Sequence, residues 1–174
     1  MAFNERAVRA AIRAVPNFPK RGIMFRDITP LLKDPNLFGA CIDEMAKRLS
    51  TLEFDYIAGI ESRGFILGVA LSQRMHKGFI VLRKAGKLPY HKTVSSYKTE
   101  YSIEVLEMHN DAVEPGRRVL IVDDLLATGG TASAAADLIK KLNGSVAGYA
   151  FLIELAALGG RLKLQEKICS LITY

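Results

Sequence analysis

Short apolar segments alternate with segments of helical periodicity along most of the chain, and this alternation restricts the fold more than any other feature. Strands are expected at residues 55–60, 78–83, 119–122, 145–154 and 167–172, and helices at 64–75 and 130–142. Strands that alternate with helices predict a parallel sheet with helices on both faces. With 174 residues, the chain is expected to form one domain.

The remaining segments have a different character. A short helix is expected at residues 4–14, with Asn4 as its N-cap, and a longer one from Asp34 to about residue 52. Residues 16–30 contain several prolines and are expected to be irregular. Residues 84–115 are polar and alternating, and predict a hairpin or a mobile flap rather than a second domain.

The net charge of +6 favours anionic partners such as nucleic acid, membranes or phosphorylated metabolites. The positive charge is spread out, with one cluster at residues 83–98, so no nucleic acid is expected as a partner. The longest apolar stretches are too short to cross a bilayer, and the N-terminus has no apolar signal region. Cys41 and Cys169 allow at most one disulfide and have no metal-ligand spacing, which favours a reducing cytoplasm. We therefore expect a cytoplasmic protein, and the short apolar stretches predict no membrane partner.

Residues 119–131 carry the strongest functional signal. The expected strand ends in Asp123 and Asp124, and the loop 127–131, Ala-Thr-Gly-Gly-Thr, leads into a helix. Backbone N–H groups of such a loop bind anions well, and glycine permits close approach. The paired carboxylates would repel further phosphates but accept hydrogen bonds from a ribose diol. A sugar phosphate therefore fits the string, against the alternative of a turn with a solvated acid pair.

Residues 119–131 resemble the phosphoribosyl pyrophosphate (PRPP) signature of the type I phosphoribosyltransferase family, and in particular of its adenine-specific members. Segments 17–30, 61–65, 83–89 and 96–101 also resemble this family, in its order and approximate spacing. The resemblance covers nearly the whole chain. The departures are small, such as His91-Lys92 after Pro89 and the short end at Tyr174.

The resemblance implies an α/β fold, an open parallel sheet flanked by helices, in a single domain over 1–174. A base-binding hood is implied at 1–34 and a flexible flap at 84–115. The implied reaction is purine salvage by a glycosyltransferase, in which PRPP and adenine give AMP and pyrophosphate. Mg²⁺ is the implied cofactor, held mainly by substrate oxygens and water, so no metal motif is expected. A homodimer is also implied, in which Arg83 acts either in its own site or in that of the neighbouring subunit.

The site residues that the resemblance implies fall into five groups. They are Ala127, Thr128, Gly129, Gly130 and Thr131 for the PRPP phosphate; Ser62, Arg63, Arg83, Lys84 and Lys87 for pyrophosphate; Met24, Phe25, Arg26 and Leu125 for adenine; Glu100, Asp123 and Asp124 for catalysis; and Tyr101 in the flap. Free N–H groups and a guanidinium at a helix start also suit pyrophosphate on chemical grounds.

Structural roles remain open for several of these residues. Arg63 could pair with an acid at a helix start, the basic run could be a solvated loop, and Phe25 could anchor a loop. The residues alone do not favour Glu100 over Glu104 or Glu107. Two other functions also remain open: a phosphoribosyltransferase for 6-oxopurines, and a non-catalytic regulator that senses PRPP on the same fold.

Overall fold

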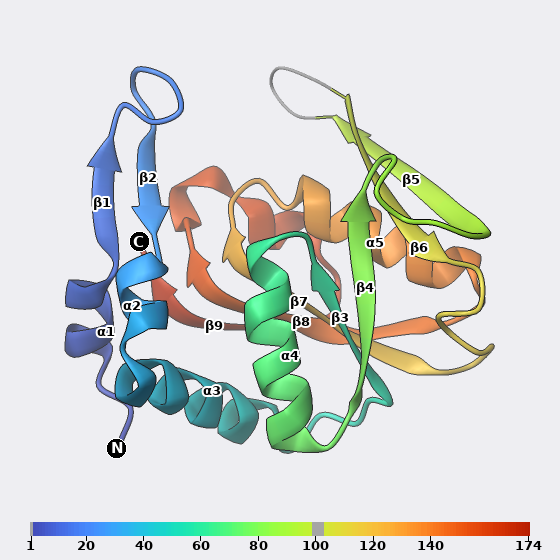
Figure 1. Ribbon diagram of the computed structural model, residues 1–174, viewed down its shortest axis with the longest axis horizontal. Coiled ribbons are helices and arrows are strands. Elements are labelled where there is room, and N and C mark those ends of the chain that lie inside the picture. Colours follow the sequence, from blue (N-terminus) through green and yellow to red (C-terminus); the bar gives the residue numbers. More distant parts are fainter. Residues whose placement is uncertain (1, 99–102) are drawn as a thin grey trace. The chain divides into compact units, whose positions relative to one another are not determined.

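The sheet predicted from the alternating pattern is present. The computed structural model describes residues 2–98 and 103–174, and its chain divides into two units, Met1–Glu44 and Met45–Tyr174. The strands of the second unit are β3 (Tyr56–Ile60), β4 (Gly78–Lys84), β5 (Lys92–Lys98), β6 (Ile103–His109), β7 (Arg118–Leu126), β8 (Ser145–Glu154) and β9 (Lys167–Thr173). Within the described residues they form one sheet in the order β5-β6-β4-β3-β7-β8-β9 (Figure 1).

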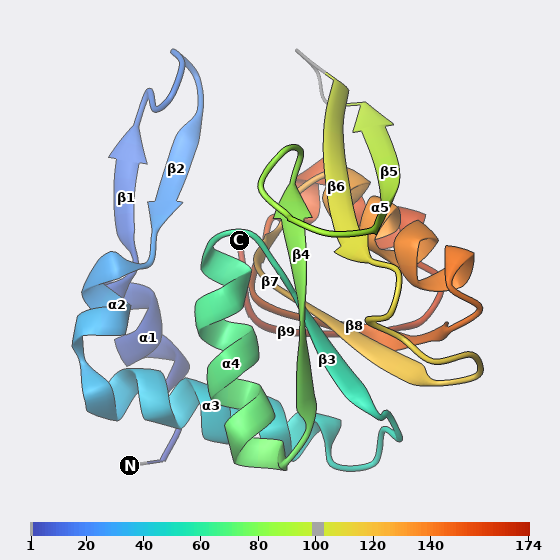
Figure 2. The same ribbon diagram turned by 45° about the vertical axis from the view of Figure 1, so that its right-hand side comes forward.

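The central strands are parallel, and helices cover both faces of the sheet. β4, β3, β7, β8 and β9 pair in parallel, whereas β6 is antiparallel to both β4 and β5. Helices α4 (Arg63–Met75) and α5 (Gly130–Lys141) lie on opposite faces of the sheet (Figures 1 and 2). α4 buries Leu67 and Leu71, and α5 buries Leu138 and Ile139. The predicted fold class is therefore confirmed.

Strand β7 is longer than its sequence indicates. Its pairing with β8 continues to Leu126 opposite Glu154, but its pairing with β3 ends at Val122 opposite Gly59. The prediction that the strand ends before Asp123 was wrong, because apolar residues beyond the acids pair with β8 and carry the strand onward. On the β3 side the acids lie past the last paired residue, so the sheet is open beside them.

Residues 84–115 contain a long antiparallel hairpin, one of the two forms expected for this segment. β5 and β6 pair from Lys92 opposite His109 to Lys98 opposite Ile103. The hairpin joins the sheet through β6, where Arg83 and Lys84 of β4 pair with Glu107 and Leu106 (Figure 2). Its mobility stays a prediction.

The first unit contains α1 (Glu5–Ala11), β1 (Arg13–Pro16), β2 (Met24–Asp27), α2 (Thr29–Lys33) and the first part of α3 (Pro35–Leu49). The Asn4 side chain caps α1 and the Asp34 side chain caps α3, as predicted. The segment expected to be irregular instead holds β2, which pairs with β1 from Arg13 opposite Asp27 to Pro16 opposite Met24. The prolines indicate the turn between these strands, but they do not indicate that the residues on either side pair. No helix in the described ranges is long and apolar enough to cross a membrane.

Candidate active site

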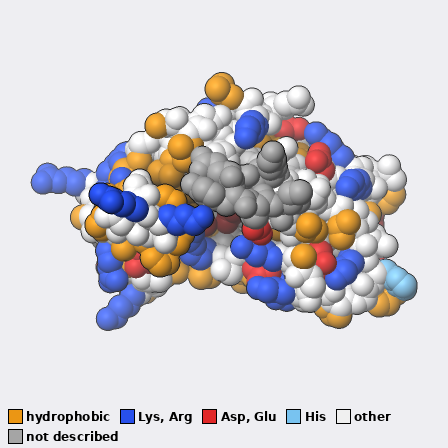
Figure 3. All heavy atoms as spheres, turned by 90° about the horizontal axis from the view of Figure 1, so that it is seen from above, with side chains coloured by type: hydrophobic (Ala, Val, Ile, Leu, Met, Phe, Trp, Pro, Cys, Tyr) orange, Lys and Arg blue, Asp and Glu red, His pale blue; other side chains and the backbone are white. Residues whose placement is uncertain are grey.

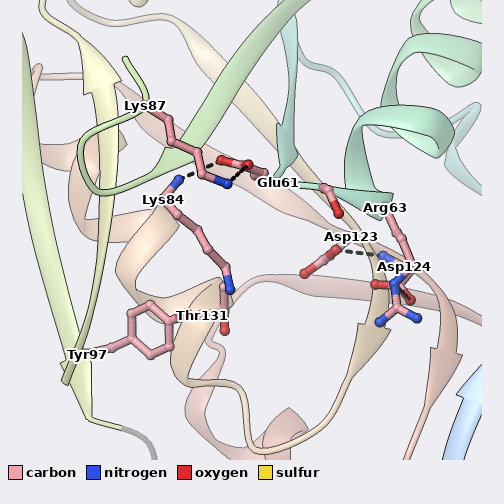
Figure 4. Close-up of a pocket in the computed structure, with 9 residues that line it drawn as sticks. Glu61, Arg63, Lys84, Lys87, Tyr97, Asp123, Asp124 and Thr131 are labelled. Carbon is pink, nitrogen blue, oxygen red and sulfur yellow. Dashed lines mark hydrogen bonds and ion pairs between the residues drawn. The ribbon is translucent and has the colours of Figure 1, made fainter. Parts of the chain in front are cut away.

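A pocket of about 330 Å³ lies at the carboxyl ends of β3, β4 and β7, where parallel sheets commonly bind ligands (Figure 4). Its walls are polar and come from strands, loops and a helix start that are far apart in sequence. The residues that line it are Glu61, Ser62, Arg63, Lys84, Lys87, Tyr97, Asp123, Asp124 and Thr131. The structure thus brings together seven residues proposed from the sequence, Ser62, Arg63, Lys84, Lys87, Asp123, Asp124 and Thr131.

The acid pair on β7 combines two buried or half-buried carboxylates. Asp123 Oδ1 accepts a hydrogen bond from the backbone N–H of Asp124 at 2.8 Å, and Asp124 Oδ2 lies 3.1 Å from Arg63 Nε. Burial raises the pKa of Asp123, and the neighbouring charge of Asp124 raises it further. Burial also raises the pKa of Asp124, although Arg63 opposes that rise. Burying two adjacent carboxylates costs free energy, and carboxylates with pKa values raised in this way are typical of functional sites.

The loop after β7 surrounds a second, smaller hollow of about 60 Å³. Among its lining residues are the remaining members of the predicted phosphate loop and its neighbour, Leu125, Ala127, Thr128, Gly129 and Gly130, together with Thr131. Gly129, at φ +78°, immediately precedes α5, so N–H groups of the first helical turn, which have no partner within the helix itself, lie in this loop. Thr131 lines both hollows and therefore connects the loop to the acid pair.

A second glycine-containing segment packs against this loop. Gly160 begins the short helix η2 (Gly160–Lys163), and its carbonyl oxygen would lie 2.6 Å from a Cβ built on Gly129. A Cβ on Gly160 would in turn overlap the carbonyl oxygen of Ala127 and lie 2.9 Å from the Gly129 nitrogen. The two backbones approach so closely that neither position has room for a side chain.

We expect Gly160→Ala to displace the phosphate loop without unfolding the protein. Because the obstructing atoms belong to the backbone of Ala127 and Gly129, the loop itself must move. A displacement of about 1 Å costs up to about 10²-fold in rate, so kcat/KM for PRPP, the substrate that the sequence resemblance implies, should fall roughly 10- to 100-fold. Steady-state kinetics with Gly39→Ala as control measures this, since a Cβ on Gly39 meets nothing within 4 Å. Equal kcat/KM values in the two variants would contradict the close-packed arrangement.

Glu61 binds several basic residues at one side of the pocket (Figure 4). Its carboxylate accepts hydrogen bonds from Arg83 Nε at 3.1 Å, from the backbone N–H of Lys84 at 2.9 Å and from Lys87 Nζ at 2.6 Å. The peptide bond from Glu61 to Ser62 is cis. Burial alone would raise the pKa of Glu61, but the three donors together lower it to about 2.

This lowered pKa predicts how stability changes in acid. Glu61 ordinarily has a pKa of 4.5 and in the folded protein one of about 2, so the unfolded state binds the proton more readily. Its stabilising contribution is therefore complete above about pH 4.5 and is lost as the pH falls towards 2. We expect Glu61→Gln to flatten the pH dependence of the unfolding free energy in this window, as measured by urea denaturation. An unchanged slope would contradict the assignment.

The other predicted residues lie elsewhere or outside the described ranges. Met24, Phe25 and Arg26 are on β2 in the first unit, where the Phe25 ring meets Phe18 edge-on at 5.1 Å. Glu100 and Tyr101 lie outside the described residues, so their proposed roles stay predictions.

Sequence reasoning did not assign two of the residues that line the pocket. Glu61 stands directly after an apolar strand and before Ser62, a position that signals a strand-end acid. Tyr97 lies on β5 and lines the pocket together with Thr131. Tyr97 belongs to segment 96–101, which resembles the family, but the segment does not indicate a place beside Thr131, because that place depends on how the hairpin folds over the sheet.

Positive charge is interspersed with negative charge on the surface. Lys and Arg side chains lie beside Asp and Glu side chains at several places on the face in Figure 3. Ion pairs on the surface include Arg9 with Glu5 and Arg117 with Asp55. Such mixing fits a small anionic ligand better than an extended nucleic acid.

Comparisons with known proteins agree with this site. The phosphoribosyl transferase domain matches residues 27–172. The chain is 51% identical to an adenine phosphoribosyltransferase of Pseudothermotoga lettingae, over 96% of this chain and 99% of that protein. Among solved structures, the adenine phosphoribosyltransferase of Thermoanaerobacter pseudethanolicus has a TM-score of 0.96 at 48% identity, covering 98% of this chain and 100% of that one.

A more distant structure has the same fold. The Saccharomyces cerevisiae adenine phosphoribosyltransferase gives a TM-score of 0.90 at 38% identity, covering 96% of this chain and 97% of that one. Its structure is a complex with adenine and an imino-altritol bisphosphate. The similarity in sequence and in fold extends over nearly all of both chains in each comparison, so this chain belongs to the adenine phosphoribosyltransferase family of phosphoribosyl transferase domains.

Proposed function

We propose that this protein transfers phosphoribose from PRPP to adenine and releases AMP and pyrophosphate. In this reaction N9 of adenine forms a bond to the anomeric carbon, and the bond from that carbon to the pyrophosphate oxygen breaks. The observation that carries the proposal is a pair of hollows that share Asp123 and Thr131 and together combine an acid pair, a glycine-containing anion loop and several cationic side chains. PRPP has a phosphate, a diol and a pyrophosphate, which match these three features.

Each part of the substrate has a proposed partner. The loop 127–131 binds the phosphate, which fixes the sugar relative to the sheet. Asp123 and Asp124 accept hydrogen bonds from the ribose hydroxyls and stabilise the positive charge that develops at the anomeric carbon. Ser62, Arg63, Lys84 and Lys87 bind the pyrophosphate, and Arg83 supports them through Glu61.

Adenine is the proposed base because the relatives with about 50% identity bear its name and the yeast relative is a complex with it. Met24, Phe25, Arg26 and Leu125 are the proposed adenine-binding residues. An aromatic ring such as that of Phe25 can stack on a planar base.

Mg²⁺ is the proposed cofactor. It commonly binds through one or two carboxylates, substrate phosphates and water, and the pocket offers Asp123 and Asp124 while PRPP offers many oxygens. The negative charge of Asp123 and Asp124, held there against burial, would favour a cation nearby. When bound, Mg²⁺ neutralises charge on the departing pyrophosphate.

We also propose a homodimer located in the cytoplasm. Helix α4 exposes Ile66 and Val69, which are 43% and 44% exposed and suit burial against a second copy. Cys41 and Cys169 are both free and buried, which suits a reducing compartment. Light scattering coupled to gel filtration measures the assembly, and a monomer at micromolar concentration would count against it.

The decisive experiment supplies PRPP and Mg²⁺ with adenine, hypoxanthine or guanine, and separates the nucleotides by chromatography. We expect AMP and an equal amount of pyrophosphate with adenine, and much less product with the 6-oxopurines. Preference for a 6-oxopurine would replace the proposed base. Binding of PRPP without turnover on any base would instead indicate a regulator.

A further inference from the structure

The loop between β4 and β5 carries the cationic side of the pocket. Lys84 ends β4, Lys87 lies within the loop, and both line the pocket (Figure 4). The side chains are long and flexible, so their place depends on how well the loop backbone is fixed. Glu61 holds one side of it, from inside the pocket, through Lys84 and Lys87 themselves.

A second carboxylate holds the loop from outside the pocket. Glu107 is on β6, is only 4% exposed and does not line the pocket. Its Oε1 accepts a hydrogen bond from the backbone N–H of Gly86 at 2.9 Å, and its Oε2 accepts one from that of Leu88 at 3.3 Å. These two amides flank Lys87, so Glu107 fixes the backbone immediately before and after that residue.

Lys92 completes this attachment. Its ammonium donates to Glu107 Oε2 at 2.9 Å and to the Leu88 carbonyl oxygen at 3.0 Å. The ion pair with Lys92 neutralises the charge of Glu107, so Lys84 and Lys87 are not required to balance it. The carbonyl oxygen of Pro89 lies 2.7 Å from His109 Nε2, two residues along β6, which adds another contact to the same strand.

Removal of Glu107 would leave the loop without acceptors for these amides. Leu88 is buried, so its N–H cannot easily turn to water. A buried donor without a partner is costly, and the loop would move to satisfy it. Lys87 would then lose the fixed backbone from which it reaches Glu61 and the pocket.

We propose that Glu107 is a positioning residue for the PRPP site: it fixes the β4–β5 loop so that Lys84 and Lys87 face the pyrophosphate before the substrate arrives. Glu107 does not touch the substrate and acts through the backbone of Gly86 and Leu88. The inference rests on the proposed function for the identity of the ligand. The attachment of the loop itself can be tested without that function.

The first test is kinetic and uses Glu107→Gln, which keeps the size but removes the charge and one acceptor. We expect the KM for PRPP to rise roughly 10- to 100-fold, since hydrogen bonds to a charged group are lost, while the KM for adenine changes less than about twofold. Glu114→Gln is the matched control. Glu114 accepts a hydrogen bond from the Tyr56 hydroxyl at 2.8 Å, near the start of β3, and should leave both constants unchanged.

The second test follows the loop directly by limited trypsin digestion of the ligand-free protein. Cleavage between Lys87 and Leu88 should be faster in Glu107→Gln than in the wild type or Glu114→Gln. Lys92→Met, which retains the carboxylate but removes the ammonium, should shift both readouts in the same direction by a smaller amount. It serves as the test variant if Glu107→Gln does not fold.

The outcomes separate the two proposals. A wild-type protein without PRPP turnover would refute the proposed function, while the digestion would still report on the loop. Unchanged PRPP constants and unchanged cleavage at Lys87 would overturn the positioning role. A lower melting temperature with equal losses for PRPP and adenine would also overturn it, because Glu107 would then serve only the stability of the fold.

Discussion

Replacing Asp123 and Asp124 together by asparagine is expected to lower kcat/KM for PRPP by about 10²- to 10⁴-fold. A hydrogen bond to a charged acceptor is worth about 1.5–3 kcal/mol, and about 1.4 kcal/mol corresponds to a factor of ten. Asparagine keeps the shape of each side chain but removes the charge that would stabilise the cationic sugar. Steady-state kinetics with saturating adenine measures the effect.

Although activity should fall, the thermal stability of the single variant Asp123→Asn should not. Asp123→Asn removes a carboxylate disfavoured by burial and by Asp124, and an amide oxygen can still accept from the Asp124 N–H. Its melting temperature should equal or exceed that of the wild type. Asp124→Asn also weakens the ion pair with Arg63, so it should be the less stable of the two. Near-normal AMP synthesis by the double variant would refute the ribose-binding role.

Glu100→Gln is expected to lower kcat by about 10²- to 10⁴-fold, the usual contribution of general acid–base assistance. Adenine must lose a proton as N9 attacks, and the acid pair and the basic side chains that line the pocket already have proposed partners in PRPP. Affinity for PRPP should stay similar. Single-turnover kinetics is the measurement of choice, because slow product release can hide an effect on the chemical step.

Two comparisons separate proton transfer from simple placement of the flap. Glu100→Leu should lose at least as much activity as the glutamine variant, whereas a purely positional role would spare glutamine and affect only leucine. Glu104→Gln tests the neighbouring acid on β6, which the sequence could not distinguish from Glu100. A wild-type single-turnover rate in Glu100→Gln would remove this residue from proton transfer.

The fold was predicted well from the sequence where the hydrophobic periodicity and the helix or strand end signals indicated the same element. α4, α5 and the central parallel strands were found within a few residues, because each combines an apolar face with clear terminal signals. The end of β7 was misplaced because two adjacent acids resemble a strand end, while pairing with β8 is a tertiary contact. β2 was missed for a similar reason, since its partner β1 supplies the order that its own residues do not indicate.

The site was predictable where a motif stands on one strand–loop–helix unit, as at Asp123, Asp124 and Thr131. It was less predictable where distant segments meet. The sequence alone could not choose between Glu100 and Glu107, and the structure explains Glu107 by its contacts with Gly86, Leu88 and Lys92. The close approach of Gly129 and Gly160 also lies beyond any local pattern, because it joins two loops.

The pairing of β3 with β7 has a consequence for folding. The two halves of the pocket follow these strands, and Tyr56 pairs with Val119 across more than a third of the chain. Contacts between residues so distant in sequence form late, because closing a long loop costs entropy before any contact compensates for it. We therefore expect ligand binding to recover more slowly during refolding than the helical circular dichroism signal. The rate at which binding recovers would then measure how fast the two halves of the sheet join.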